Sequence, residues 1–220
     1  MLRIKNIRWF IAGLLLVATA LSFLDRQVLS VAILKIKADF NISDVGYGWI
    51  NTAFLVSYAI MFSVGGWLID KFGTRLGLAV SVGLWSVANA LHGAVQNITQ
   101  LGIARFFLGF GEGGCFPGAS KGITEWFPKK ERATAMGIAI GGSALGAVLA
   151  PPLTVYLVSA LSWRGAFIIT GSIGIAWVII WLLLFNKPSK SKLVTARELE
   201  KINQDGNDTA KSEGQNVIKV

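Results

Sequence analysis

The charged residues of this 220-residue sequence are spaced so that five long stretches contain no Asp, Glu, Lys or Arg. These stretches are residues 9–24, 45–69, 76–104, 133–163 and 165–186. A helix of about 20 apolar residues crosses the hydrocarbon core of a bilayer, which is about 30 Å thick. The spacing of the charges therefore predicts an integral membrane protein built from transmembrane helices.

Six transmembrane helices are expected, because the 76–104 stretch is too long for one span and has a polar break at residues 96–100. The first and fourth spans are extended to include charged residues at membrane depth. The predicted helices are Trp9–Leu34, Val45–Ile69, Leu76–Ala94, Ile98–Pro117, Ala133–Val158 and Arg164–Asn186. Residues 1–186 thus form a six-helix bundle of the all-α class, and residues 187–220 form a polar cytoplasmic tail with a short helix at 196–203.

Lys and Arg residues outside the spans indicate the orientation of the bundle. One side carries 16 of them, including all seven that follow residue 186, whereas the other side carries only Lys35, Lys37 and Arg164. Because cytoplasmic loops are enriched in basic residues, both termini are expected to face the cytoplasm.

The composition argues against several other classes of protein. Apolar residues make up 53% of the chain and charged residues 15%, which is unlike a disordered chain or a water-soluble enzyme. The single Cys115 and the single His92 provide no disulfide framework and no Cys- or His-based metal site. The basic residues follow the membrane topology, so no nucleic-acid partner is expected. No enzymatic activity and no cofactor are predicted.

Glycines recur at four-residue spacing inside the predicted spans. Such spacing places small residues on one face of a helix and lets neighbouring backbones approach closely. We interpret these pairs as helix-packing positions: Gly109 and Gly113, Gly137 and Gly141, and Gly142 and Gly146.

Four ionisable residues lie at membrane depth: Asp25, Arg26, Arg105 and Glu112. Such residues are costly in a bilayer and usually face a protein interior or a water-filled path. Arg105 and Glu112 share one helix face but stand about 10 Å apart along the axis, too far for a direct bond. Each is therefore expected to pair with another helix, for which the Asp25-Arg26 pair is available. The alternative is a buried ion-pair network that only holds the first and fourth helices together.

The chemistry of these side chains suits co-transport of an organic anion with protons. An arginine stays charged and offers a planar fork of donors that matches a carboxylate. A buried carboxyl group next to an arginine can take up and release a proton near neutral pH. The function expected from the residues alone is therefore anion binding coupled to protonation.

The loop between the second and third predicted helices reads GWLIDKFGTR at residues 66–75. It closely resembles the G-x-x-x-D-R/K-x-G-x-R/K loop of the major facilitator superfamily, at the same place and on the cytoplasmic side. This resemblance implies that Asp70 and Arg75 help to latch the cytoplasmic gate. A simple capping role for Asp70 is compatible with this interpretation.

Further segments resemble a narrower branch, the anion:cation symporters, and look most like the bacterial hexuronate transporters. They are residues 23–32, 104–109, 124–132, 142–153 and 163–167. By this resemblance, Arg26 is the ligand of the substrate carboxylate, and Asp25 and Glu112 are the pair that takes up protons. Arg105 is the basic partner that acts on Glu112.

The same resemblance implies two further pocket residues. Tyr58 matches a tyrosine that lines the sugar site, whereas from the sequence alone packing with a bonded hydroxyl is the favoured explanation of this residue. Ser143 on the fifth predicted helix is the other pocket residue. The implied fold is the N-terminal half of a major facilitator transporter, formed by two inverted three-helix repeats.

The implied function is proton-coupled symport of a sugar-acid anion, a hexuronate or an aldonate, across the bacterial inner membrane. The family fold has two six-helix halves with the substrate between them, so a complementary C-terminal six-helix half is expected as partner. The chain is expected to be a fragment, a truncated product or one part of a split transporter. The alternatives are symport of another small organic anion, aromatic or dicarboxylic, and a non-transporting membrane fragment.

Overall fold

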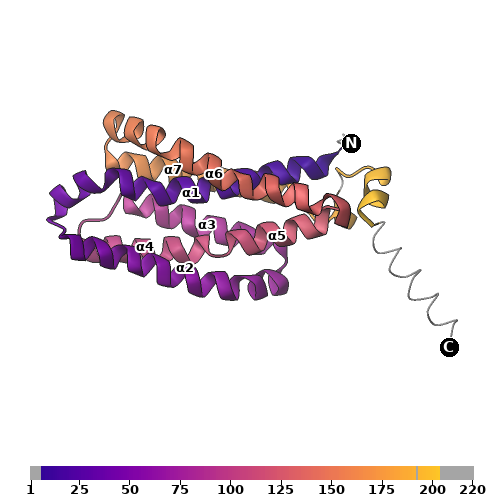
Figure 1. Ribbon diagram of the computed structural model, residues 1–220, viewed down its shortest axis with the longest axis horizontal. Helices are drawn as coiled ribbons and strands as arrows, with labels where there is room; N and C mark the ends of the chain where they lie inside the picture. The colour runs from indigo at the N-terminus through magenta and orange to yellow at the C-terminus, as the bar shows by residue number, and fades with distance from the viewer. Residues whose placement is uncertain (1–5, 192, 204–220) are drawn as a thin grey trace.

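The computed structural model describes residues 6–191 and 193–203, and α-helices dominate both ranges (Figure 1). The main helices are α1 (Ile7–Phe40), α2 (Asp44–Phe72), α3 (Thr74–His92), α4 (Ile98–Glu112), α5 (Cys115–Trp126), α6 (Lys129–Ala160) and α7 (Trp163–Leu184), followed by the 3-10 turn η1 (Pro188–Lys190). They run along the long axis of one elongated bundle. The described residues contain no strand, and the all-α prediction is confirmed.

Helices α4 and α5 together form the fourth span, and this differs from the predicted single helix Ile98–Pro117. The two helices are separated at Gly113 and Gly114, which keep helical backbone angles. Pro117 does not end the span, because it lies in the first turn of α5, where a missing backbone N–H is tolerated. The predicted end of this helix was therefore wrong, and the span continues to Trp126.

Four of the described helices, α1, α2, α6 and α7, are long and apolar enough to cross a membrane by themselves. The third span is the 19-residue α3, which packs against α7 and α4. The fourth is shared by α4, with 15 residues, and α5, with 12. The six predicted spans are thus all present as helices, although two of them lack a long apolar window in one unbroken helix.

The packing of the helices shows an internal symmetry. The most extensive contacts join α1 to α6, α2 to α4 and α3 to α7. If the first, second and third spans are exchanged with the fourth, fifth and sixth, these three pairs map onto one another. The spans of each exchanged pair cross the bundle in opposite directions, as in an inverted repeat of three helices.

Close backbone approach explains two of the three predicted glycine pairs. A Cβ atom on Gly146 would lie 2.2 Å from the carbonyl oxygen of Ala20, so only glycine permits this contact between α6 and α1. Gly109 approaches Phe54 of α2 in the same way. The prediction was wrong for Gly137 and Gly141, where a Cβ would meet no described atom within 4 Å.

Two buried apolar clusters fill the bundle and meet at the level of Asp25 and Arg26. On α1, the first cluster runs from Ile7 to Leu21 and the second from Leu24 to Ile36. The charged pair therefore lies between the two apolar clusters, in the middle of the bundle. This position makes unpaired charge expensive and demands specific partners.

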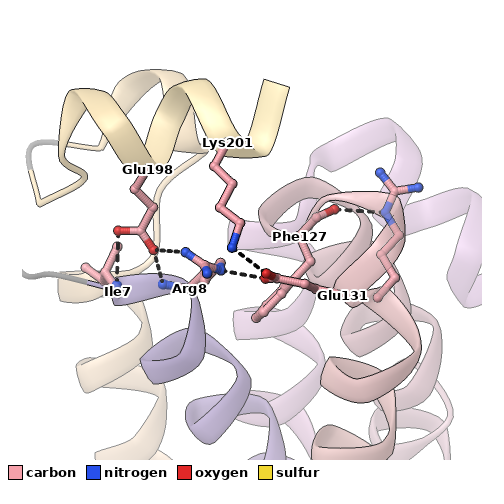
Figure 2. Close-up of polar contacts among 7 residues, drawn as sticks. Ile7, Arg8, Phe127, Glu131, Glu198 and Lys201 are labelled. Carbon is pink, nitrogen blue, oxygen red and sulfur yellow. Dashed lines mark hydrogen bonds and ion pairs between the residues drawn. The ribbon is translucent and has the colours of Figure 1, made fainter. Parts of the chain in front are cut away.

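Residues 196–203 are helical, which confirms the short helix predicted in the tail. This helix, yellow in Figure 1, lies at the same end of the bundle as the start of α1. Figure 2 shows how it is attached: Glu198 accepts from Arg8, Arg8 also donates to Glu131 of α6, and Lys201 donates to Glu131. The first part of the tail is thus bound to the bundle by alternating charges.

Candidate functional site

Asp25 and Arg26 follow each other on α1 but point toward different helices. Successive residues of an α-helix are turned by about 100°. Arg26 contacts Glu112 at the end of α4, and Asp25 contacts Asn89 on α3. The structure therefore confirms that the charged pair of the first helix provides a partner for the fourth, and it separates the two carboxyl groups.

The Arg26–Glu112 ion pair is the centre of the site. Nη2 and Nε of Arg26 lie 2.7 and 3.2 Å from Oε2 of Glu112, and the hydroxyl of Ser22 donates to the same oxygen at 3.2 Å. Glu112 is fully buried, whereas 28% of the Arg26 side chain is exposed. The guanidinium is thus the charged group that a solute can reach.

Aromatic rings surround the guanidinium of Arg26. Its Cζ atom lies 4.9 Å from the ring centres of Phe23 and Tyr58 and 5.0 Å from that of Phe54. Cation–π attraction of this kind holds the planar group in place, more strongly where water is excluded. Tyr58 therefore lies beside Arg26, in agreement with the interpretation that it belongs to the site.

Arg105 bonds to the backbone of α1 rather than to the carboxylate of Glu112. Its Nη2 donates to the backbone carbonyl of Arg26 at 3.1 Å, and its guanidinium lies 5.0 Å from the ring centre of Phe54. Only 2% of the residue is exposed. Arg105 acts on Glu112 as a nearby buried positive charge, and its direct contacts are with α1 and α2.

Asp25 lies among polar groups that sequence reasoning missed. Asn89 Nδ2 donates to Asp25 Oδ1 at 2.7 Å and to Thr170 Oγ1 of α7 at 2.7 Å. All three residues are fully buried. Asn89 and Thr170 lie in the charge-free stretches of the third and sixth spans, and only the packing of α3 and α7 against α1 brings them to Asp25.

Ser143 is not brought together with the other predicted pocket residues. Its hydroxyl donates to the carbonyl of Ile140 in its own helix at 2.6 Å. The neighbouring Gly142 packs against Leu16, which is about 15 Å from Arg26 along α1. A pocket role for Ser143 stays a prediction.

The two predicted gate residues, on either side of the junction between α2 and α3, have separate partners. Asp70 accepts from Lys121 of α5 at 2.5 Å, an interaction that the sequence analysis did not anticipate. Arg75 donates to the carbonyl of Leu182 near the end of α7 at 2.5 Å, and Trp181 donates back to the carbonyl of Arg75. These contacts tie α2 to α5 and α3 to α7, and the gating roles stay predictions.

Comparison with known proteins identifies the family. The profile of the Major Facilitator Superfamily matches residues 15–215. The chain belongs to this superfamily. The crystal structure of a bacterial homolog of the human lysosomal transporter Spinster, inward-facing and unoccupied, superposes with a TM-score of 0.79 at 26% identity, over 84% of this chain and 44% of that one. The all-α fold of one half of such a transporter is therefore confirmed.

Curated relatives show which transporters within the superfamily are similar to this chain. The galacturonate transporter of Dickeya chrysanthemi is 35% identical over 92% of this chain and 59% of its own length. The hexuronate transporter of Escherichia coli is 36% identical over 92% of this chain and 47% of its own. A probable sulfoacetate transporter of Cupriavidus necator is 37% identical, over 91% and 46%. The chain thus spans about half the length of the curated relatives it matches, and their being membrane transporters points to a non-enzymatic role.

Proposed function

We propose that this bundle is the N-terminal half of a proton-coupled symporter for a sugar-acid anion, a hexuronate or an aldonate. The named relatives include transporters of galacturonate, hexuronate and D-galactonate, which supports this substrate class. The bundle works with a complementary six-helix half, whether that half is on the same polypeptide or on another. It lies in the bacterial inner membrane with both ends of the bundle's chain in the cytoplasm.

The observation that carries this proposal is the ion pair between a partly exposed arginine and a fully buried carboxylate. The carboxylate of a sugar acid fits the guanidinium fork of Arg26, but Glu112 already holds that fork. Protonation of Glu112 removes the competing negative charge and releases Arg26 for the substrate. Because one negative charge replaces another at Arg26, binding of the anion and uptake of the proton are coupled.

The neighbouring residues have assisting roles. Tyr58 and Phe54 present aromatic rings beside Arg26, against which the apolar face of a sugar ring can pack. Arg105 favours the ionised form of Glu112 and so helps to discharge the proton after transport. Asp25 is a second proton acceptor, fully buried and hydrogen-bonded to Asn89 of α3.

Another small organic anion is the second candidate substrate. Sulfoacetate carries no sugar ring, and the probable transporter of this compound matches the chain as well as the sugar-acid transporters do. Arg26 serves an anionic group in either case. If the substrate is a sugar acid, its hydroxyl groups would be recognised by the complementary half.

The experiment that tests the proposal is competition for substrate uptake by membrane vesicles that contain the bundle together with its complementary half. Uptake of radiolabelled galacturonate, galactonate and sulfoacetate is measured in turn with an imposed proton gradient, and each unlabelled compound competes with labelled galacturonate. Inhibition by both sugar acids at lower concentration than by sulfoacetate supports a sugar-acid carrier. Stronger inhibition by sulfoacetate favours the second candidate, and absence of gradient-driven uptake of any of the three contradicts the proposal.

A further inference from the structure

The carboxyl group of Asp25 is buried where α3 and α7 pack against α1. The side-chain amide of Asn89 on α3 donates to the carboxyl group of Asp25 and to the hydroxyl of Thr170 on α7. Each of these two hydrogen bonds is 2.7 Å long. All three side chains are fully buried. A polar chain in such surroundings is costly unless its donors and acceptors are matched.

The three side chains match each other in both protonation states of Asp25. An ionised carboxylate only accepts hydrogen bonds, and the amide nitrogen of Asn89 supplies a donor. A protonated carboxyl group also has a hydrogen to donate, and the amide oxygen of Asn89 can accept it after the amide group turns over. The hydroxyl of Thr170 can accept from the amide nitrogen or donate to the amide oxygen, so it follows either orientation.

Two acceptor atoms of this chain lack a partner in the observed arrangement, and one of them, the amide oxygen of Asn89, is the atom that the second arrangement would use. Within the described residues, Oδ2 of Asp25 and Oδ1 of Asn89 have no hydrogen-bond partner. Buried polar atoms without partners are rare in folded proteins and call for an explanation. When the amide turns over, the Asn89 oxygen takes the place of Nδ2 beside Oδ1 of Asp25, so a proton on Oδ1 would give this oxygen a hydrogen-bond partner.

We propose that Asn89 and Thr170 are positioning residues that keep the Asp25 carboxyl group hydrogen-bonded in both protonation states. Uptake of a proton forms one O–H bond on Asp25 and turns the amide of Asn89, and release reverses both changes. A change in the protonation state of Asp25 thereby changes the hydrogen bonds of side chains on α3 and α7, although neither Asn89 nor Thr170 contacts the substrate. The use of this proton for transport rests on the proposed function, whereas the hydrogen-bond exchange does not.

Asn89 donates a hydrogen bond to Asp25, and the side chains of Thr170 and Trp85 also lie next to its carboxyl group. Glu112 and Arg105 on α4 act on the carboxyl group through space. On α3, the ring of His92 lies one turn beyond Asn89, bonded to the carbonyl of Ala88 and stacked on Phe167. The span of α7 from residue 165 onward contains no charged residue and contributes the hydroxyl of Thr170.

Infrared difference spectroscopy of the full 220-residue chain in lipid vesicles tests the inference directly. Spectra at high and low pH are subtracted, and the carboxylic-acid band that disappears in Asp25→Asn is assigned to Asp25. In the unaltered chain, we expect this band to be accompanied by a change in a side-chain amide band. In Asn89→Leu, the amide change should be lost and the acid band should shift to higher frequency, because its hydrogen bond is gone.

A matched pair of threonine variants provides the control. Thr170→Val removes the hydroxyl next to Asn89 and should also shift the acid band. Thr154→Val is the same substitution at a fully buried threonine of α6 outside this chain, and it should leave both bands unchanged. If Asn89→Leu does not fold, the Thr170 and Thr154 variants alone decide the matter.

Two results would overturn the inference. One is an acid band that keeps its frequency in Asn89→Leu or Thr170→Val, and the other is the absence of any titrating band assigned to Asp25. Adding galacturonate to vesicles that hold the chain together with its complementary half examines the proposed function separately, because the substrate lies between the two halves. A sample that shows the expected bands but never responds to the sugar acid supports the hydrogen-bond exchange and counts against the proposed substrate.

Discussion

Removal of the Glu198 carboxylate should detach the tail helix from the bundle. Glu198 accepts from the backbone N–H groups of Ile7 and Arg8, both at 3.2 Å, and from Nη1 of Arg8 at 3.0 Å (Figure 2). Helix α1 has no capping side chain of its own, because Asn6 makes no cap bond and the first turn has no acidic residue. Glu198, although 191 residues from Ile7, therefore acts as the cap of α1.

The expected loss in Glu198→Ala follows from these contacts. Loss of a helix cap costs about 1 kcal/mol, and loss of a hydrogen bond to a charged group costs about 1.5 kcal/mol. Arg8 is not left unpaired, since Glu131 remains 2.9 Å from its Nε, and the larger penalty of an isolated buried charge does not apply. A total of about 2.5 kcal/mol increases the detached population about 70-fold.

Hydrogen exchange of the full chain in lipid nanodiscs measures this change. Amides of residues 196–203 and of the first turn of α1 should exchange about 70-fold faster in Glu198→Ala, while those of α4 should not change. Glu200→Ala is the matched control, because Glu200 is an exposed acid of the same helix. Equal exchange in the two variants would refute the capping role of Glu198.

Three further outcomes test the topology, the packing and the need for a second half. A thiol introduced at Gln96 should be labelled from outside the cell and one at Lys130 should not, and the reverse labelling would invert the orientation. Gly146→Ala should lower the free energy of unfolding by about 3 kcal/mol, because the new Cβ would lie 2.2 Å from the Ala20 carbonyl, whereas Gly137→Ala meets no neighbour and should be neutral in a thermal melt. The purified 220-residue chain alone should give no gradient-driven accumulation in liposomes, and accumulation there would show that one bundle, or a dimer of it, suffices.

The spans and the central ion pair were predictable because their signal is local. Charge-free stretches mark the membrane helices, and charges left inside a span must find partners. The seven-residue spacing of Arg105 and Glu112 predicts that both lie on the same face of a helix. Only the residues that they contact on the neighbouring helix remained to be determined. In the structure, Arg26 is the partner of Glu112, and the backbone carbonyl of Arg26 is the partner of Arg105.

Other features could not be predicted because they depend on contacts between distant segments. Asn89 and Thr170 are ordinary polar residues in apolar spans, and their role appears only when α3 and α7 pack against α1. The bond from Ile7 to Glu198 joins the two ends of the described chain. The interruption of the fourth span at Gly113 and Gly114 also depends on packing, because α2 and α6 continue through the glycine pairs Gly65-Gly66 and Gly141-Gly142.

The central claim is that Glu112 and the substrate carboxylate compete for Arg26, and transport by Glu112→Gln tests it most directly. The bundle and its complementary half are reconstituted together, and exchange and accumulation of labelled galacturonate are measured in the same vesicles. The amide imitates the protonated acid and leaves Arg26 free, so exchange across the membrane should persist while accumulation driven by a proton gradient is lost. Arg26→Lys keeps the charge without the planar fork and should lose both. Full gradient-driven accumulation by Glu112→Gln, together with normal exchange by Arg26→Lys, would contradict the account and leave the pair a structural ion pair.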